Sequence, residues 1–198
     1  MTMSSTTTRH PLLQGFIDDL RAIWAANGDT GVRMERARIL LQKLVLNPQL
    51  QAVSESWPST EGRKNLLLYV NFEYEFVINA VVRAPGRKGN IHDHAHAWVL
   101  YGILCGTESL ERFERIDDGS REGHAEVRLQ SVSTGRPGSV DLVKPGDIHA
   151  EQGGPTRSVA IILRSAKLGE VIQNRYDMET CTILPGPGPE QIPFELTA

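Results

Sequence analysis

The sequence lacks the features that would place the protein in a membrane, an oxidising compartment or a complex with nucleic acid. No apolar run approaches the roughly 20 residues that span a bilayer, and residues 1–10 lack the apolar stretch of a signal peptide. The two cysteines, Cys105 and Cys181, are too few for a disulfide framework, and reduced thiols are the simpler interpretation. The formal net charge of −3 gives no reason to expect nucleic acid or an anionic membrane as a partner. We therefore expect a cytoplasmic protein with neither partner.

The chain is long enough for one domain with its own core. Its 198 residues contain 40% hydrophobic and 23% charged residues, as in an ordinary globular protein. Residues 1–10, rich in Ser and Thr, are predicted to form a disordered tail, and residues 11–198 a single domain. Within that domain we expect a helical part over 11–48, a barrel over 64–165 and a C-terminal extension over 166–198.

Apolar residues at three- and four-residue spacing predict two helices near the N-terminus. The first begins at Pro11, which suits a first helical turn. The second begins near Asp29 and is closed by Asn47-Pro48, since the residue before a proline avoids helical geometry. Neither helix carries a cluster of chemically useful side chains, so both are predicted to pack against the body of the protein.

From about Leu66 the sequence becomes typical of a β-domain. Short segments rich in β-branched and aromatic residues alternate with turns that contain Gly, Pro and Asp. Such a series predicts a sandwich or barrel, of which the jelly roll is one arrangement. The predicted strands are Leu66–Val70, Phe72–Val82, Ala97–Leu104, Ser109–Ile116, Glu126–Val132, Ser139–Val143 and Ser158–Leu163.

Four of the six histidines form the most informative pattern in the chain. His92, His94 and His96 alternate, and side chains at alternate positions of a strand point the same way. His92 and His94 are therefore expected to face one space and hold one metal ion together. His96 is left as a spare ligand, an outer hydrogen-bonding partner or simply the residue after the site. The third ligand must come from elsewhere, and His149 follows a Pro-Gly turn that would start a new strand.

This spacing resembles the two cupin motifs. The first motif runs Gly, five residues, His-x-His, three or four residues, Glu, six residues, Gly, and Gly86, His92, His94, Val99 and Gly106 fall in that register. The second motif is a Pro-Gly turn followed by a histidine, matched by the segment 145–149. The resemblance implies a mainly β cupin jelly-roll barrel, or double-stranded β-helix. Val99 stands where most cupins place a glutamate ligand, so the three-histidine site is neutral and leaves coordination positions open. Imidazole suits Fe, Zn, Cu and Ni alike, so spacing does not choose the metal.

The segment 91–98, Ile-His-Asp-His-Ala-His-Ala-Trp, followed by 102–108, resembles the cysteine dioxygenase and 3-mercaptopropionate dioxygenase family. The resemblance is faint outside the histidine segment. It implies a mononuclear non-haem Fe(II) cofactor bound by His92, His94 and His149. In that family the substrate thiolate binds iron, and O2 is activated there to give a sulfinic acid. The implied partners are therefore O2 and a small thiol, with a carboxylate as a further recognition group.

Other features of that family match less well. The nearest equivalents of its substrate-binding arginine are Arg63 and Lys64. The alternative interpretation is that these two residues are solvated charges in a loop. Its Ser-x-His-x-Tyr segment falls on Ala160, Ile162 and Arg164, so that relay is absent. Arg164 either brings a positive charge to the pocket mouth, where it holds a carboxylate, or lies on the surface after the strand. The cysteine that some members link to the tyrosine falls at position 99, so the crosslink is absent too.

Three hypotheses follow. The leading one is an iron(II) thiol dioxygenase in which Arg63 and Arg164 contact the substrate. The second is a three-histidine cupin dioxygenase that cleaves a C–C bond of a diketone or diol. The third is a cupin that binds a metal or ligand without catalysis, although no basic recognition helix favours a regulator. Trp98 either forms a pocket wall or fills the barrel. Tyr176 is a residue of the C-terminal segment that could reach the site, although nothing in the spacing requires it. The oligomeric state stays open.

Overall fold

The structure is a computed structural model that describes residues 9–26, 28–166 and 172–197. In these ranges the helices are α1 (Pro11–Ala25), α2 (Thr30–Val45) and α3 (Pro48–Ser54). The strands are β1 (Lys64–Val70), β2 (Val77–Arg83), β3 (Ile91–His92), β4 (Val99–Cys105), β5 (Glu108–Arg115), β6 (Val127–Gly135), β7 (Val140–Val143), β8 (Ile148–Gly153), β9 (Ser158–Arg164), β10 (Ile172–Asp177), β11 (Thr182–Pro187) and β12 (Glu190–Pro193). Residues 1–8 of the predicted tail lie outside the described residues, whereas the backbone of Arg9 bridges Thr197 and the His10 N–H donates to the Leu196 carbonyl (2.8 Å).

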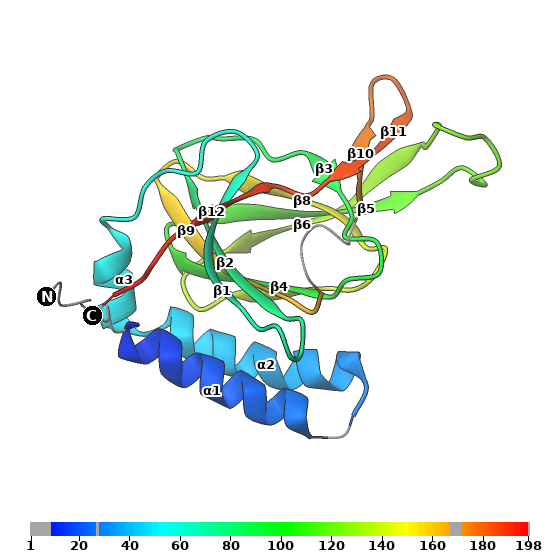
Figure 1. Ribbon diagram of the computed structural model, residues 1–198. Helices are drawn as coiled ribbons and strands as arrows, with labels where there is room; N and C mark the ends of the chain where they lie inside the picture. The colour runs from blue at the N-terminus through cyan, green and yellow to red at the C-terminus, as the bar shows by residue number, and fades with distance from the viewer. Residues whose placement is uncertain (1–8, 27, 167–171, 198) are drawn as a thin grey trace, which may run out of the picture.

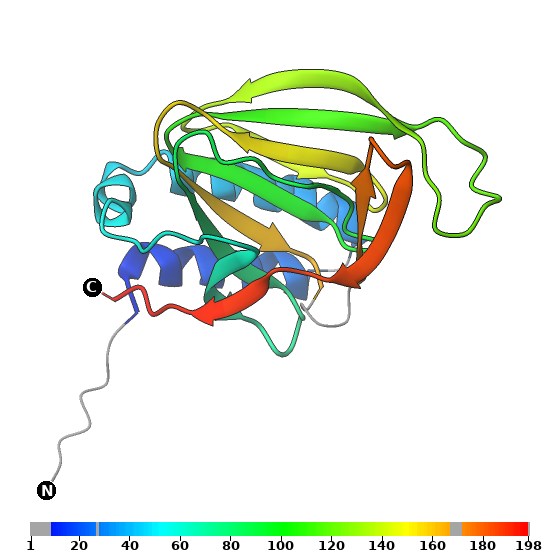
Figure 2. The ribbon, with the colours of Figure 1, turned by 90° about the horizontal axis from the view of Figure 1, so that it is seen from above.

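The strands form two six-stranded sheets with the order of a jelly roll (Figures 1 and 2). The first sheet has the order β12-β1-β2-β9-β4-β7 and the second β11-β10-β3-β8-β5-β6. When β2 to β9 are lettered B to I, the central parts of the two sheets read B-I-D-G and C-H-E-F. The pairings among these eight strands are antiparallel, and β12 runs parallel to β1. The predicted cupin jelly-roll barrel is confirmed.

The helices cover the outer face of the first sheet, as Figure 1 shows below β1, β2 and β4. Leu41 and Val45 of α2 lie so close to Gly102 that a Cβ there would meet them at 3.0–3.1 Å. Strands β2 and β9 are buried along their whole length, because one face meets the helices and the other lines the barrel. This packing is what the apolar stripes of the two N-terminal helices predict. Among the described helices, none is both long and apolar enough to cross a bilayer.

Three segments differ in structure from the sequence-based expectations. The strand predicted from Phe72 begins only at Val77, because Asn71 accepts from the N–H groups of residues 73 and 74 and folds the intervening segment into a turn. The second helix ends where predicted, but Asn47 then caps a third helix through hydrogen bonds from Gln49 and Leu50. The C-terminal extension contains three strands, β10 to β12, that join both sheets.

The distal glycine of the first motif, Gly106, occupies a position that only glycine fits. Its φ is +72°, and a Cβ there would lie 2.4 Å from the Arg157 carbonyl oxygen. Gly119 has the same φ of +72° in an exposed loop, where the nearest atom to a Cβ is 3.6 Å away. We expect Gly106→Ala to lower the free energy of unfolding by about 3 kcal/mol, and Gly119→Ala by about 1 kcal/mol from left-handed strain alone. Urea denaturation measures both. Equal losses in the two variants would show that the close backbone contact at Gly106 has no energetic effect.

Candidate metal centre

Three histidines converge at the cavity inside the barrel. One ligand nitrogen from each of His92, His94 and His149 lies within 4.8 Å of the others. His92 and His149 are direct partners across the antiparallel pair β3–β8, which brings their ring centroids to 4.3 Å. The centroid of the His94 ring is 4.8 Å from that of His92 and 4.9 Å from that of His149. The structure therefore brings the three predicted ligands together, in an arrangement that can hold one divalent ion.

The local structure around His94 differs from the expected regular strand. Strand β3 ends at His92, and His94 reaches the cluster from a turn in which Ala95 has φ +48°. The side chain of His96 is exposed and is not part of the histidine cluster. His92 and His94 thus converge because the chain bends between them. The same bend turns His96 away from the cluster.

Asp93, between the two ligands, holds this bend in place. Its carboxylate accepts from the N–H groups of Ala95 (3.0 Å) and Asn174 (3.2 Å), the Asn174 side-chain amide (3.0 Å) and the Tyr176 hydroxyl (2.7 Å). Burial raises the pKa of Asp93, but these hydrogen bonds outweigh it and lower the pKa below its usual value. Tyr176 therefore contacts the ligand-bearing turn and not the centre itself.

We expect Asp93→Ala to lower the free energy of unfolding by about 3 kcal/mol and to weaken metal binding at least tenfold. The change removes four acceptor contacts and frees the turn that places His94. Asp118→Ala, in an exposed loop where the carboxylate accepts from Ser120 N–H (2.9 Å), is the matched control and should change neither quantity. Metal binding by Asp93→Ala equal to wild type would contradict this role.

Two of the histidines, His92 and His94, are held in the neutral form, which is the form that binds metals. Burial, reinforced by the neighbouring His149, lowers the pKa of His92 to about 4. Burial and the adjacent Arg164 lower the pKa of His94 well below its usual value. The Nδ1 atoms of His92 and His149 lie 3.0 and 3.2 Å from the carbonyl oxygens of residues 90 and 147, which places the ring proton on Nδ1. The Nε2 atom of His149 is buried without a hydrogen-bond partner among the described residues. A buried nitrogen lone pair without a hydrogen-bond donor can bind a metal ion.

His94 has different outer partners. Its Nδ1 lies 2.6 Å from Gln173 Nε2 and 3.1 Å from Arg164 Nη1. A guanidinium can only donate, so in this arrangement Nδ1 accepts and the neutral ring carries its proton on Nε2. Exchange of the oxygen and nitrogen of the Gln173 amide gives His94 the tautomer of the other two ligands, with Nδ1–H donating to the amide oxygen. The metal-binding form of the site requires that exchange.

Arg164, the last residue of β9, lies inside the protein. It is 5% exposed, and no carboxylate of the described residues forms an ion pair with it. Burial, partly opposed by Glu151, lowers its pKa to about 10, so the guanidinium is charged at neutral pH. Its Nε is buried without a hydrogen-bond partner in the described chain. The alternative that places Arg164 on the surface is wrong, and the residue remains a candidate for binding an anion.

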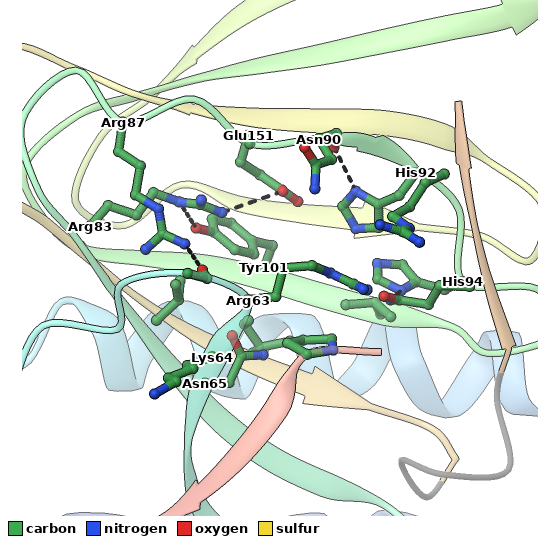
Figure 3. Close-up of a pocket in the computed structure, with 18 of the residues that line it drawn as sticks. Arg63, Lys64, Asn65, Arg83, Arg87, Asn90, His92, His94, Tyr101 and Glu151 are labelled. Carbon is green, nitrogen blue, oxygen red and sulfur yellow. Dashed lines mark hydrogen bonds and ion pairs between the residues drawn. The ribbon is translucent and has the colours of Figure 1, made fainter. Parts of the chain in front are cut away.

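The cavity beside the histidines is strongly cationic (Figure 3). It has a volume of about 330 Å³. Among the described residues, its lining contains seven arginine and lysine residues and one carboxylate, that of Glu151. Arg63 and Lys64 belong to this lining, although Arg63 also donates to the Pro187 carbonyl (2.6 Å) and Lys64 lies 3.9 Å from Glu190. The other cationic residues are Arg83, Arg87, Lys88, Arg164 and Arg175.

A buried polar network lies beside the centre and was not foreseen from the sequence. Arg83 is 3.2 Å from Glu108 and 3.5 Å from Glu151, and it donates to the Tyr101 hydroxyl (3.3 Å). The Tyr101 hydroxyl donates to Glu108 (2.8 Å), as does Ser158 (2.6 Å). One signal for Glu151 was present, since it follows His149 by two residues and so shares its face of β8. The strand that supplies Gln173 and Arg175 carried no comparable signal.

Other candidate positions have structural roles. Val99 and Ile162 line the cavity as apolar wall, while Ala160 belongs to the apolar core inside the barrel. Trp98 neither walls this cavity nor fills the barrel, because it packs outside against Gly31 at the start of α2. Cys105 is a strand residue whose thiol lies 3.4 Å from the Ser54 hydroxyl.

The solved structures compared below resemble this chain at low sequence identity. No protein-family model and no curated protein matches the chain significantly. Among solved structures, a protein with a double-stranded β-helix domain from Klebsiella pneumoniae is 17% identical, with a TM-score of 0.43 over 61% of this chain and 85% of that chain. A recombinant oxalate oxidase in complex with glycolate is 20% identical (TM-score 0.38, 46% of this chain and 42% of that chain). The Schizosaccharomyces pombe Cnp3 cupin domain is 12% identical (TM-score 0.39, 52% and 64%).

These TM-scores are too low to carry an argument, so the fold assignment rests on the strand order. The strand order and the histidine cluster define the protein as a cupin-type jelly roll with a candidate metal centre.

Proposed function

We propose that the protein is a mononuclear non-haem iron(II) dioxygenase of the thiol dioxygenase type, acting on a small thiol that carries a carboxylate. The observation that carries this proposal is the convergence of three histidines beside a cationic cavity that contains Arg164, which has no counter-ion among the described residues. The resemblance of segment 91–98 to the thiol dioxygenases supports the choice of iron and of a thiol.

The proposed reaction is balanced without a further reductant. A thiolate and O2 give a sulfinate, in which two new S–O bonds replace the O–O bond, and the four electrons lost by sulfur are those gained by dioxygen. A redox-active ion bound by His92, His94 and His149 would supply the place where both reactants meet. The apolar side chains of Val99 and Ile162 exclude water from that part of the cavity.

Arg164 is the group that best fits the substrate carboxylate. A guanidinium donates two parallel hydrogen bonds to a carboxylate, and such a pair is strong away from water. Arg164 Nη1 now faces His94 Nδ1. Once His94 carries its proton on Nδ1, two donors face each other, so the guanidinium loses this acceptor and is free for an anion. The His94 tautomer with its proton on Nδ1 therefore favours both metal binding at Nε2 and anion binding at Arg164, so each binding event strengthens the other.

Tyr101 does not replace the missing Ser-His-Tyr relay. Burial raises the pKa of Tyr101 well above its usual value, so the phenol stays protonated. Its hydroxyl donates a hydrogen bond to Glu108, and Arg83 donates to its oxygen. The hydroxyl proton is therefore directed at a buried carboxylate and not at a substrate.

The test is O2 uptake by the iron-reconstituted protein with cysteine, 3-mercaptopropionate, cysteamine or a β-diketone, with product analysis under ¹⁸O2. We expect uptake with a thiol carboxylate, a sulfinate that carries both oxygen atoms from ¹⁸O2, and loss of uptake in His92→Ala. Uptake only with the diketone would replace this proposal by C–C cleavage. Absence of uptake with every compound after reconstitution would leave a binding role.

A further inference from the structure

We infer that Glu151 is a fourth protein ligand of the metal centre. Glu151 and His149 are alternate residues of β8, so both side chains point into the barrel. Glu151 is 7% exposed and lines the cavity with His92 and His94. Figure 3 shows its carboxylate between Arg83 and the histidines, directed toward His92. The inference rests on the proposed metal site but not on the proposed reaction.

The distance between Glu151 and His149 matches that between two ligands of one ion. Glu151 Oε1 lies 3.3 Å from His149 Nε2. Two donors about 2.1 Å from the same ion are separated by about 3.0 Å at a right angle and about 3.4 Å at a tetrahedral angle. The observed separation lies between these two values.

The contact needs a proton or a metal ion between its two atoms. The Asp147 carbonyl places the ring proton of His149 on Nδ1, so Nε2 presents a lone pair to the carboxylate oxygen. Nε2 makes no hydrogen bond with any described residue, Glu151 included. Two lone-pair atoms this close inside a protein repel unless a proton or a metal ion lies between them. His92 and His94 converge with His149, so a metal ion bound by the three histidines would lie beside the Glu151 carboxylate, which is 3.3 Å from His149.

Arg83 orients the second carboxylate oxygen. Its Nη2 lies 3.5 Å from Glu151 Oε2, and its Nε lies 3.2 Å from Glu108, so the guanidinium is fixed at both ends. Ligating carboxylates are commonly held by such an outer partner.

Glu151 compensates for the missing glutamate of the first motif. Val99, at that motif position, is an apolar residue of β4 in the first sheet, whereas Glu151 comes from β8 in the second. A carboxylate ligand reduces the charge of the centre by one.

The test is Co(II) binding by the metal-free protein, measured as affinity and as visible absorption, which reports the coordination of Co(II). Glu151→Gln keeps the shape of the side chain and removes the ligand charge. We expect the affinity for Co(II) to fall more than 100-fold, beyond the 10- to 100-fold typical of losing an outer partner, and the absorption spectrum to change. Glu111→Gln is the matched control, since Glu111 on the adjacent strand accepts from Gln152 (3.0 Å) and does not line the cavity. Its affinity and spectrum should equal those of wild type.

An unchanged Co(II) spectrum in Glu151→Gln overturns the inference whatever the affinity, because Glu151 is then outside the coordination sphere. If the variant does not fold, the crystal structure of the Co(II)-loaded wild-type protein decides. We expect a Glu151 oxygen at about 2.0–2.2 Å from the ion. A distance beyond about 3 Å would show that Glu151 is not a ligand. Since no step uses a thiol or O2, this result is independent of the proposed activity.

Discussion

Replacing Arg164 with methionine is expected to stabilise the metal-free protein and to abolish tight binding of an anionic substrate. The guanidinium is buried without a carboxylate partner among the described residues, and its Nε makes no hydrogen bond with them. A buried charge without a counter-ion opposes folding, and an apolar side chain of similar length removes that penalty. We expect the free energy of unfolding to rise by about 2 kcal/mol, which corresponds to roughly 4–8 °C in melting temperature for a chain of this size.

The same variant should lose the substrate carboxylate. Removal of one partner of a buried charge pair weakens binding by about 2–4 kcal/mol, or roughly 30- to 1,000-fold in Kd. Calorimetric titration with 3-mercaptopropionate measures this loss. Arg157→Met is the matched control, since Arg157 donates to the carbonyls of residues 54 and 57 (2.9 and 3.0 Å) and does not line the cavity. That change should destabilise the protein and leave the affinity unchanged. A destabilised Arg164→Met with normal affinity would show that Arg164 has a structural role only.

Removing His149 is expected to abolish stabilisation by metal. A divalent ion at 100 times its Kd adds about 2.7 kcal/mol to the free energy of unfolding of the wild-type protein, or roughly 5–10 °C in melting temperature. In His149→Ala the buried Nε2 atom is absent, so added Co(II) or Fe(II) should not shift the melting temperature. His96→Ala is the matched control, because that histidine lies in the same segment but is exposed and outside the cluster. A metal-dependent shift retained in His149→Ala would place the ion elsewhere.

The fold was predictable from the sequence because its signals are local. Gly86, the histidine pair and Gly106 stand in the cupin register, and Gly106 indeed needs its positive φ and a backbone contact that excludes a side chain. The apolar stripes of α1 and α2 likewise match the face that packs on the first sheet. The strands of the C-terminal extension were not predicted, because β11 and β12 contain Pro and Gly and are stabilised by pairing with distant strands.

The candidate site was predictable only in part. His92, His94 and His149 were identified from spacing, although His94 arrives through a bend that Asp93 stabilises and not along a regular strand. The role of Gln173 depends on the antiparallel pairing of β10 with β3, which no local pattern encodes. Glu151 lies outside both cupin motifs, and Val99 stands at the position of the first-motif glutamate, so the motifs do not indicate a carboxylate at the site.

The most direct test of the metal centre is elemental analysis of the protein purified under anaerobic conditions, compared with His149→Ala and His96→Ala. We predict stoichiometric iron in the wild-type protein and in His96→Ala, and its loss in His149→Ala. A wild-type protein without metal that also fails to bind Fe(II) on reconstitution, or a His149→Ala variant with undiminished iron, would contradict the assignment of the histidine cluster as the metal centre.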